Sequence, residues 1–268
     1  MNNQVALTQE EILAKLKEGS DEAVNVSNYP FIPILEIDNS KEVKQVDGED
    51  VEILVKPRWR MTTKENGELV KTPYSDKFGA VVLKVRYGVS KKYDPNSTEP
   101  NFYSTEFSPA CFSNEEEKIT LKLDGGDTVK MSYKDFKQKY QDKYKLTMVL
   151  YVWHQEQIMK VKLKGASMSA FWDFQKKFKG KDSVCAHVIS FGSKRENKPL
   201  AHNKAELSII DPATIPEGKV DFVKILEVQT ELNEAFEKFK EKEETIQAEL
   251  IEATIDEEAV EGEVVAEM

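Results

Sequence analysis

The most constraining stretch of this sequence is residues 146–164, which holds two short runs of alternating residues around a polar turn. The apolar positions of the two runs are Leu146, Met148, Leu150, Val152, Met159, Val161 and Leu163. A period of two residues is typical of half-buried strands. The stretch therefore predicts a β-hairpin that turns at Gln155 and Glu156.

The register of this hairpin follows from its sequence. A turn at Gln155 and Glu156 makes one face entirely apolar, whereas a slip by one residue would place lysines in that face. The outer face is then aromatic and basic, with the cross-strand pairs Tyr151–Lys160, Val149–Lys162 and Thr147–Lys164, and with Trp153 next to the turn.

This outer face has two interpretations. Flat rings stack on bases of any identity while ammonium groups contact phosphates, so the face suits a single-stranded nucleic acid. Alternatively, another part of the chain covers Tyr151 and Trp153, and the lysines keep a sheet soluble, because buried aromatic residues are common in sheets. The hairpin by itself favours the second interpretation.

Charge is distributed unevenly along the chain. The formal net charge is -10, yet residues 51–240 carry 33 basic and 26 acidic residues, while residues 1–50 and 241–268 are strongly acidic. A basic body between acidic ends is expected where an end competes with a polyanion. Solvated charged ends would give the same pattern.

Few residues are available for a metal site. The chain has two cysteines, Cys111 and Cys185, and three histidines, and none of them shows the spacing of a zinc site. We therefore predict no metal, no cofactor and reduced thiols in the cytoplasm. The N-terminus predicts a short helix from a capping box at Thr8 and Glu11, and no run is long enough to span a membrane.

The remaining elements follow from alternation and turn residues. We expect strands at 31–37, 51–61, 79–87, 118–123, 128–131, 184–191 and 205–210, helices at 132–144 and 167–179, and connections at 39–50, 62–77, 88–100 and 192–204. Arg58 and Arg60 on the strand at 51–61 could bind phosphates or could guard a sheet edge.

The order of three strands, one helix and two strands over residues 79–210 is that of an oligonucleotide/oligosaccharide-binding (OB) barrel. We therefore predict an α+β chain that is mainly β, with an OB-fold-like antiparallel barrel. The expected divisions are an acidic N-terminal part at 1–50, a β-rich nucleic-acid-binding domain at 51–215, a C-terminal helix at 216–250 and a disordered acidic tail at 251–268.

The C-terminal helix and tail differ in composition. Phe222, Ile225, Leu226, Leu232 and Phe236 give the helix an apolar face, and the tail has too little apolar surface to offset its chain entropy. The tail residues expected to bind partners are Asp256, Glu257, Glu258, Glu261, Glu263 and Glu267.

An acidic tail follows several aromatic and basic segments, which are Tyr151-Val152-Trp153, Lys160-Val161-Lys162-Leu163-Lys164-Gly165, Ser167 and Phe171 to Phe174. In this organisation the chain resembles the single-stranded DNA-binding proteins of phage and bacterial replication. The resemblance implies sequence-tolerant coating of single strands during replication or recombination, in the cytoplasm, which is the host's if a phage encodes the protein. It also implies a tail that recruits replication or recombination proteins and occupies the groove when DNA is absent. A second copy of the chain is a further candidate partner.

Two other functional classes are alternatives, a replication-associated nuclease and a structural or scaffold protein. A nuclease would need clustered carboxylates, a phosphate loop or a nucleophile with a histidine base, and the sequence shows no motif for any of them. A structural or scaffold protein would assemble through the long C-terminal helix. We predict a non-enzymatic single-stranded DNA-binding protein. The residues themselves do not distinguish DNA from RNA as the ligand. The candidate binding residues are Tyr151, Trp153, Lys160, Lys162, Lys164, Arg58, Arg60 and Arg86, followed by Trp59, Tyr87 and Tyr103.

Overall fold

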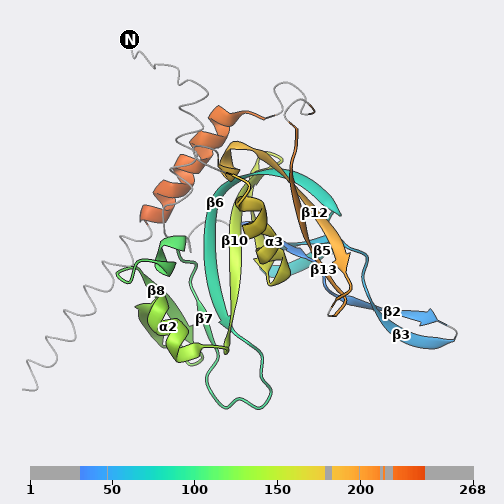
Figure 1. Ribbon diagram of the computed structural model, residues 1–268, viewed down its shortest axis with the longest axis horizontal. Helices are drawn as coiled ribbons and strands as arrows, with labels where there is room; N and C mark the ends of the chain where they lie inside the picture. Colours follow the sequence, from blue (N-terminus) through green and yellow to red (C-terminus); the bar gives the residue numbers. More distant parts are fainter. Residues whose placement is uncertain are drawn as a thin grey trace, which may run out of the picture.

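The computed structural model describes residues 31–46, 48–178, 183–198, 200–211, 214 and 220–238. Three expectations lie outside these residues: the N-terminal helix, the far half of the C-terminal helix and the acidic tail at 251–268. The described chain is mixed α and β with mostly sheet, which confirms the α+β class (Figure 1).

One large sheet holds all but two of the described strands. Its strands are β1 (Ile34–Ile37), β4 (Trp59–Glu65), β5 (Glu68–Pro73), β6 (Lys77–Lys91), β7 (Phe102–Ser104), β8 (Lys118–Leu123), β9 (Thr128–Ser132), β10 (Tyr144–His154), β11 (Gln157–Lys164), β12 (Val188–Glu196) and β13 (His202–Ile209). The order along its main path is β5-β4-β1-β11-β10-β6-β7-β8-β9. The long strand β6 pairs with β10 on one edge, and with β12 and then β7 on the other.

The predicted central hairpin and its register are confirmed. β10 and β11 pair with Tyr151 opposite Lys160, Val149 opposite Lys162 and Thr147 opposite Lys164. Gln155 and Glu156 form the turn with positive φ angles of 49° and 60°, as a tight two-residue turn requires. The inward residues of both strands are buried, because the sheet and α3 (Ala166–Gln175) cover that face.

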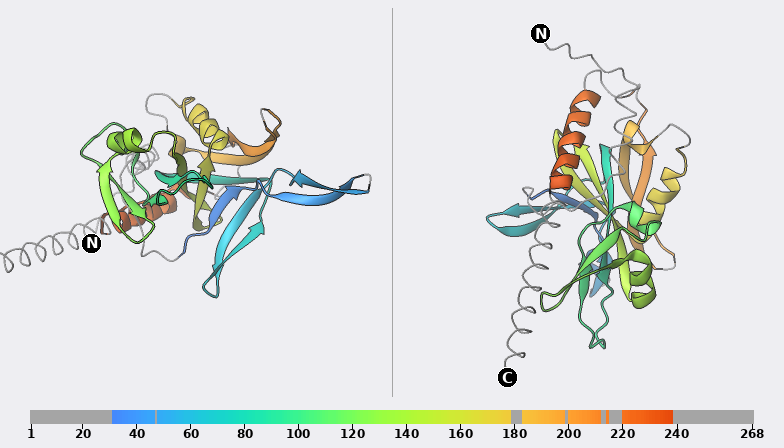
Figure 2. Two further views of the ribbon diagram at one scale, coloured as in Figure 1. Left: turned by 90° about the horizontal axis from the view of Figure 1, so that it is seen from below. Right: turned by 90° about the vertical axis from the view of Figure 1, so that its left-hand side faces the viewer.

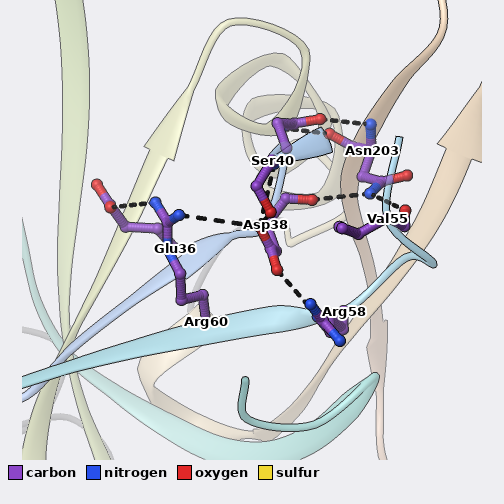
Figure 3. Close-up of polar contacts among 8 residues, drawn as sticks. Glu36, Asp38, Ser40, Val55, Arg58, Arg60 and Asn203 are labelled. Carbon is purple, nitrogen blue, oxygen red and sulfur yellow. Dashed lines mark hydrogen bonds and ion pairs between the residues drawn. The ribbon is translucent and has the colours of Figure 1, made fainter. Parts of the chain in front are cut away.

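The predicted succession of three strands, a helix and two strands is present as β6, β10, β11, α3, β12 and β13. The sheet is not closed, however, so an OB barrel is not confirmed. β1 pairs in parallel with β11 and antiparallel with β4, and hydrogen bonds through side chains join the residues that follow β1 to β13. Asn39 and Asn203 make these contacts: the Asn203 backbone N–H donates to Asn39 Oδ1 at 2.7 Å, and Asn203 Nδ2 donates to the Asp38 carbonyl at 2.8 Å (Figure 3).

Two predicted connections are wrong. Residues 39–50 contribute to an exposed hairpin of β2 (Lys41–Val46) and β3 (Glu49–Leu54), and residues 62–77 contribute to the hairpin of β4 and β5. Both hairpins project from the rest of the described chain (Figure 2). The missed signals were Asp47-Gly48 and Asn66-Gly67, dipeptides that favour tight turns even where the flanking residues are polar.

Four helical segments accompany the strands: α2 (Tyr133–Tyr140), α3, and the short 3-10 helices η1 (Pro109–Phe112) and η2 (Val184–Ala186). The Ser132 side chain accepts the Asp135 N–H and thereby caps α2.

A further helix covers residues 222–238 and lies beside β6 (Figure 1). Its apolar residues Ile225, Leu232 and Phe236 are fully buried, and Gln229 Nε2 donates to the Leu83 carbonyl of β6 at 2.6 Å. The predicted apolar face of this helix is therefore used within the same chain.

Candidate nucleic-acid interface

A hollow of about 930 Å³ lies where β1, β4, β10, β11 and β13 meet the start of α3. Its basic lining residues are Arg60, Lys92, Lys145, Lys162 and Lys164, and Glu36 is the only carboxylate among the described residues that line it. We call this hollow the basic groove. Tyr144 adds an aromatic ring to its wall, and that residue is half-buried.

The alternation of β11 places three lysines on one outer face. Lys162 lies opposite Val149 of β10 and beside Glu36 of β1, so it is half-buried. Burial lowers the pKa of Lys162, and the carboxylates of Glu36 and Glu106 oppose that change. Among the residues that the structure describes, no side chain forms an ion pair with Lys162. A partly dehydrated ammonium group of this kind favours an anionic ligand.

Glu36 is shared among the cations of the groove. Lys164 Nζ lies 3.2 Å from one Glu36 oxygen, and Arg60 Nη2 lies 3.8 Å from the other. Lys164 is largely exposed, with 60% of its side-chain surface accessible. One carboxylate thus faces three cations, Arg60, Lys162 and Lys164, so this part of the groove has an excess of positive charge.

Asp38, which lies between the groove residues Ile37 and Asn39, is hydrogen-bonded to Ser40 and Arg58 (Figure 3). Arg58 Nε donates to Asp38 Oδ2 at 2.9 Å, and Arg60 Nη1 lies 3.9 Å from Asp38 Oδ1. Burial by itself would raise the pKa of Asp38, but hydrogen bonds from Ser40 and Arg58 outweigh burial and lower it. Asp38 is therefore a stable anion that holds Arg58 in place.

Arg60 is less completely engaged than Arg58. Both of its ion pairs are long, and its Nε is buried without a hydrogen-bond partner in the described part of the chain. Of the two arginines predicted from the strand at 51–61, Arg60 lines the groove and Arg58 does not.

The C-terminal helix covers the part of this outer face that lies toward the hairpin turn. Tyr151 is fully buried there, and its hydroxyl donates to Glu106 Oε2 at 2.6 Å. Lys160 Nζ donates to the other Glu106 oxygen at 2.8 Å. The expectation that Tyr151 is an exposed stacking residue is wrong, because Phe236 packs on it from a segment 85 positions further along the chain.

Arg86 is buried in the same place. Its Nη2 donates to the Glu106 carbonyl at 2.7 Å, and its guanidinium lies 5.4 Å from the centre of the Phe236 ring. Its Nε and Nη1 are buried without a hydrogen-bond partner within the described residues. Burial lowers the pKa of Arg86 to about 10, and nearby Glu106 opposes that change. Arg86 therefore offers no surface for phosphate in this arrangement.

The other predicted aromatic residues are dispersed. Trp59 is fully buried and its Nε1 donates to the Phe191 carbonyl at 3.1 Å, while the buried Tyr87 hydroxyl accepts from Trp172 Nε1 at 3.1 Å. Trp59 and Tyr87 are core residues, contrary to their place among the binding candidates. Trp153 is half-buried and lines a separate hollow of about 540 Å³ with Val81 and Ile210. Tyr103 on β7 is exposed but lines neither hollow.

The structure thus brings together Arg60, Lys162 and Lys164 from the predicted set, and adds residues that sequence reasoning missed. Lys92 directly follows β6, Tyr144 and Lys145 are the first two residues of β10, and His202 begins β13. Their signal in the sequence was weak, because each lies just outside the alternating part of a strand. The acidic tail residues from Asp256 to Glu267 lie outside the described part of the chain.

Within residues 31–238, as far as the structure describes them, no three His, Cys, Asp or Glu side chains gather closely enough to hold a metal ion. None of the described helices combines the length and apolar character that crossing a membrane requires. Comparisons with protein-family models, with curated proteins and with solved structures find no match for this chain.

Proposed function

We propose that this protein binds single-stranded DNA without sequence preference, in the basic groove, during replication or recombination. The observation that carries the proposal is the charge of the groove: among the described residues, five Lys or Arg side chains and one carboxylate line a hollow of about 930 Å³. Cations that follow a phosphate backbone, with an aromatic side chain nearby, are the usual components of such a site.

The position of the groove supports the proposal and an OB-like interpretation of the fold. OB domains bind oligonucleotides across their second and third strands, between the loop after the first strand and the loop before the last. In the order β6, β10, β11, α3, β12, β13, the second and third strands are β10 and β11, and both contribute to the groove. Lys92 follows the first strand and His202 begins the last. The groove therefore lies where an OB domain would hold its ligand.

The acidic tail gives the proposal a competitive step. Residues 251–268 carry seven Asp or Glu and no Lys or Arg. We infer that these carboxylates occupy the basic groove when nucleic acid is absent. They become available to replication or recombination proteins when a strand displaces them. Carboxylates and phosphates compete for the same ammonium and guanidinium groups, so binding of one weakens binding of the other.

The scaffold alternative receives less support than DNA binding. The scaffold hypothesis requires the C-terminal helix to form an interface between chains, yet Ile225, Leu232 and Phe236 are buried against strands of the same chain. An assembly through that face would require the helix to leave the sheet.

A charge-matched pair of variants tests the groove. Lys145→Gln with Lys164→Gln removes two exposed groove cations, and Lys44→Gln with Lys71→Gln removes two exposed cations from the projecting hairpins. Fluorescence anisotropy with labelled oligo-dT should show a loss of affinity for the groove variant. Its slope of log K against log salt should be less steep by about 1.4, since each lost phosphate contact removes about 0.7 on single strands. Equal affinities for the two double variants would refute the groove as the binding site.

A further inference from the structure

Tyr93 is the most exposed aromatic residue in the described part of the chain. Its accessible surface is 87% of the maximum, compared with 54% for Tyr103. Its ring makes no contact with another ring among the described residues, although most aromatic side chains of this protein pack in clusters. Exposed aromatic side chains of this kind are the ones on which the bases of a single strand can stack.

The loop that carries Tyr93 is held by specific contacts. Lys91 Nζ donates to the Ser97 hydroxyl at 2.8 Å and to the Glu99 carbonyl at 2.6 Å. Lys143 Nζ donates to Glu99 Oε1 at 2.7 Å, and the Lys92 N–H donates to the Lys143 carbonyl at 2.8 Å. These contacts join both ends of the insertion between β6 and β10. The loop itself, residues 92–101, lies beyond the ends of β6 and β10 (Figure 1).

Tyr93 is adjacent to the basic groove along the chain and in space. Lys92 lines the groove and also lines a smaller hollow of about 490 Å³, whose wall includes Tyr93 and Lys143. The wall of the smaller hollow also includes Asp94, Glu99 and Asp142. Because Tyr93 directly follows Lys92 in the chain, a single strand whose phosphates contact Lys92 would pass beside the loop that carries the Tyr93 ring.

We propose that Tyr93 is a base-stacking subsite that gives the groove its preference for single strands, an inference that depends on the proposed function. A lysine or arginine contacts the phosphates of single strands and duplexes alike, so the groove cations by themselves discriminate little. A ring that stacks on a base requires that base to be unpaired and unstacked, which a duplex does not offer without an energetic cost. We therefore assign the preference for single strands over duplexes to Tyr93, and the affinity that single strands and duplexes share to the groove lysines.

The experiment compares oligo-dT with a duplex of equal length, by anisotropy, for the full chain and four variants. Tyr93→Ala should weaken binding of the single strand by about 5- to 100-fold and change duplex binding less than about twofold. Tyr93→Phe keeps the ring and should bind as the natural chain does. Lys164→Ala should weaken both ligands by similar factors. Leu69→Ala removes an exposed apolar side chain from β5 and controls for a general surface effect.

The outcomes separate this inference from the proposed function. If the natural chain binds oligo-dT and Tyr93→Ala binds it equally well, the stacking subsite is refuted and the groove stands. Equal losses for single strand and duplex in Tyr93→Ala would refute the role in strand preference. If the natural chain binds neither ligand, the proposed function fails, and this inference fails with it.

Discussion

The Phe236 ring packs edge-on against the Tyr151 ring, with centroids 5.3 Å apart and planes at 83°. This contact divides the outer face of the central hairpin in two. Toward the hairpin turn, the helix at 222–238 covers Tyr151 and Arg86. Toward the other end, Lys162 and Lys164 open into the basic groove. The hairpin thus has a basic face as its sequence predicts, and the chain's own helix covers the aromatic part of that face.

Phe236→Ala should destabilise the fold strongly. Phe236 is fully buried, and removing a buried phenyl ring costs about 3–5 kcal/mol in free energy of unfolding. Urea denaturation followed by circular dichroism measures this value. Val223→Ala is the control on the same helix, because Val223 is exposed and should change stability by less than about 0.5 kcal/mol. Equal stability of the two variants would mean that the helix does not pack on β6 and β10 in solution.

Trp153→Ala should change stability more than binding. Trp153 lies half-buried in a hollow separate from the basic groove, so the folded variant should bind oligo-dT with unchanged affinity. Its free energy of unfolding should fall by roughly 2 kcal/mol, less than for a fully buried aromatic ring. Denaturation and anisotropy on the same preparation separate the two effects. A folded variant that loses tenfold or more in affinity would return Trp153 to the stacking residues.

Asp38→Asn should lower stability in a pH-dependent manner. The pKa of Asp38 is lowered on folding, so its carboxylate contributes stability above its unfolded pKa and loses that contribution as the pH falls through its folded pKa. At pH 7 the variant should be less stable by about 1.5–3 kcal/mol, the range for a hydrogen bond to a charged group. The difference should begin to narrow as the pH falls below about 4, the ordinary pKa of an aspartate in the unfolded chain, and should disappear once the pH passes the lower pKa of folded Asp38.

Urea denaturation at several pH values, on both proteins, checks the Asp38 prediction. Asp50→Asn, at an exposed position on β3, is the control and should match the natural chain throughout. A difference for Asp38→Asn that does not depend on pH would show that the Asp38 charge is not what holds Arg58.

Removal of residues 251–268 should tighten binding of oligo-dT by roughly tenfold at low salt, where carboxylates are screened least. A full-length chain with Gln or Asn at Asp256, Glu257, Glu258, Glu261, Glu263 and Glu267 should behave like the truncated chain, because the tail acts through charge. Anisotropy over a range of salt concentrations measures both. Unchanged affinity at low salt would exclude competition between the tail and the nucleic acid.

Local patterns predicted the parts of the fold that depend on neighbours in sequence. The register of β10 and β11 followed from alternation alone, and the Asp124–Asp127 turn between β8 and β9 followed from its glycines. The strands β2 and β5 of the two projecting hairpins were missed because their residues are mostly polar and exposed, so no apolar face marked them. Their turn glycines were the remaining signal.

The candidate site was predicted only in part, for a different reason. Lys162 and Lys164 share a strand, and alternation gives their common face. The burial of Tyr151 depends on Phe236, and the sequence contains no rule for which face a distant helix will cover. The groove likewise unites Arg60, Lys92 and Lys145 from separate parts of the chain. The pairing of β10 with β6 and β11, and of β1 with β11 and β4, brings them together.

Binding of single-stranded DNA in the basic groove is tested most directly by a salt titration of the full chain by fluorescence anisotropy, with labelled oligo-dT and a duplex of equal length. We expect tighter binding of the single strand, with a slope of log K against log salt no steeper than about -3.5, the value for five phosphate contacts. Failure to bind oligo-dT at about 50 mM salt, even by the chain without residues 251–268, or a preference for the duplex, would contradict it.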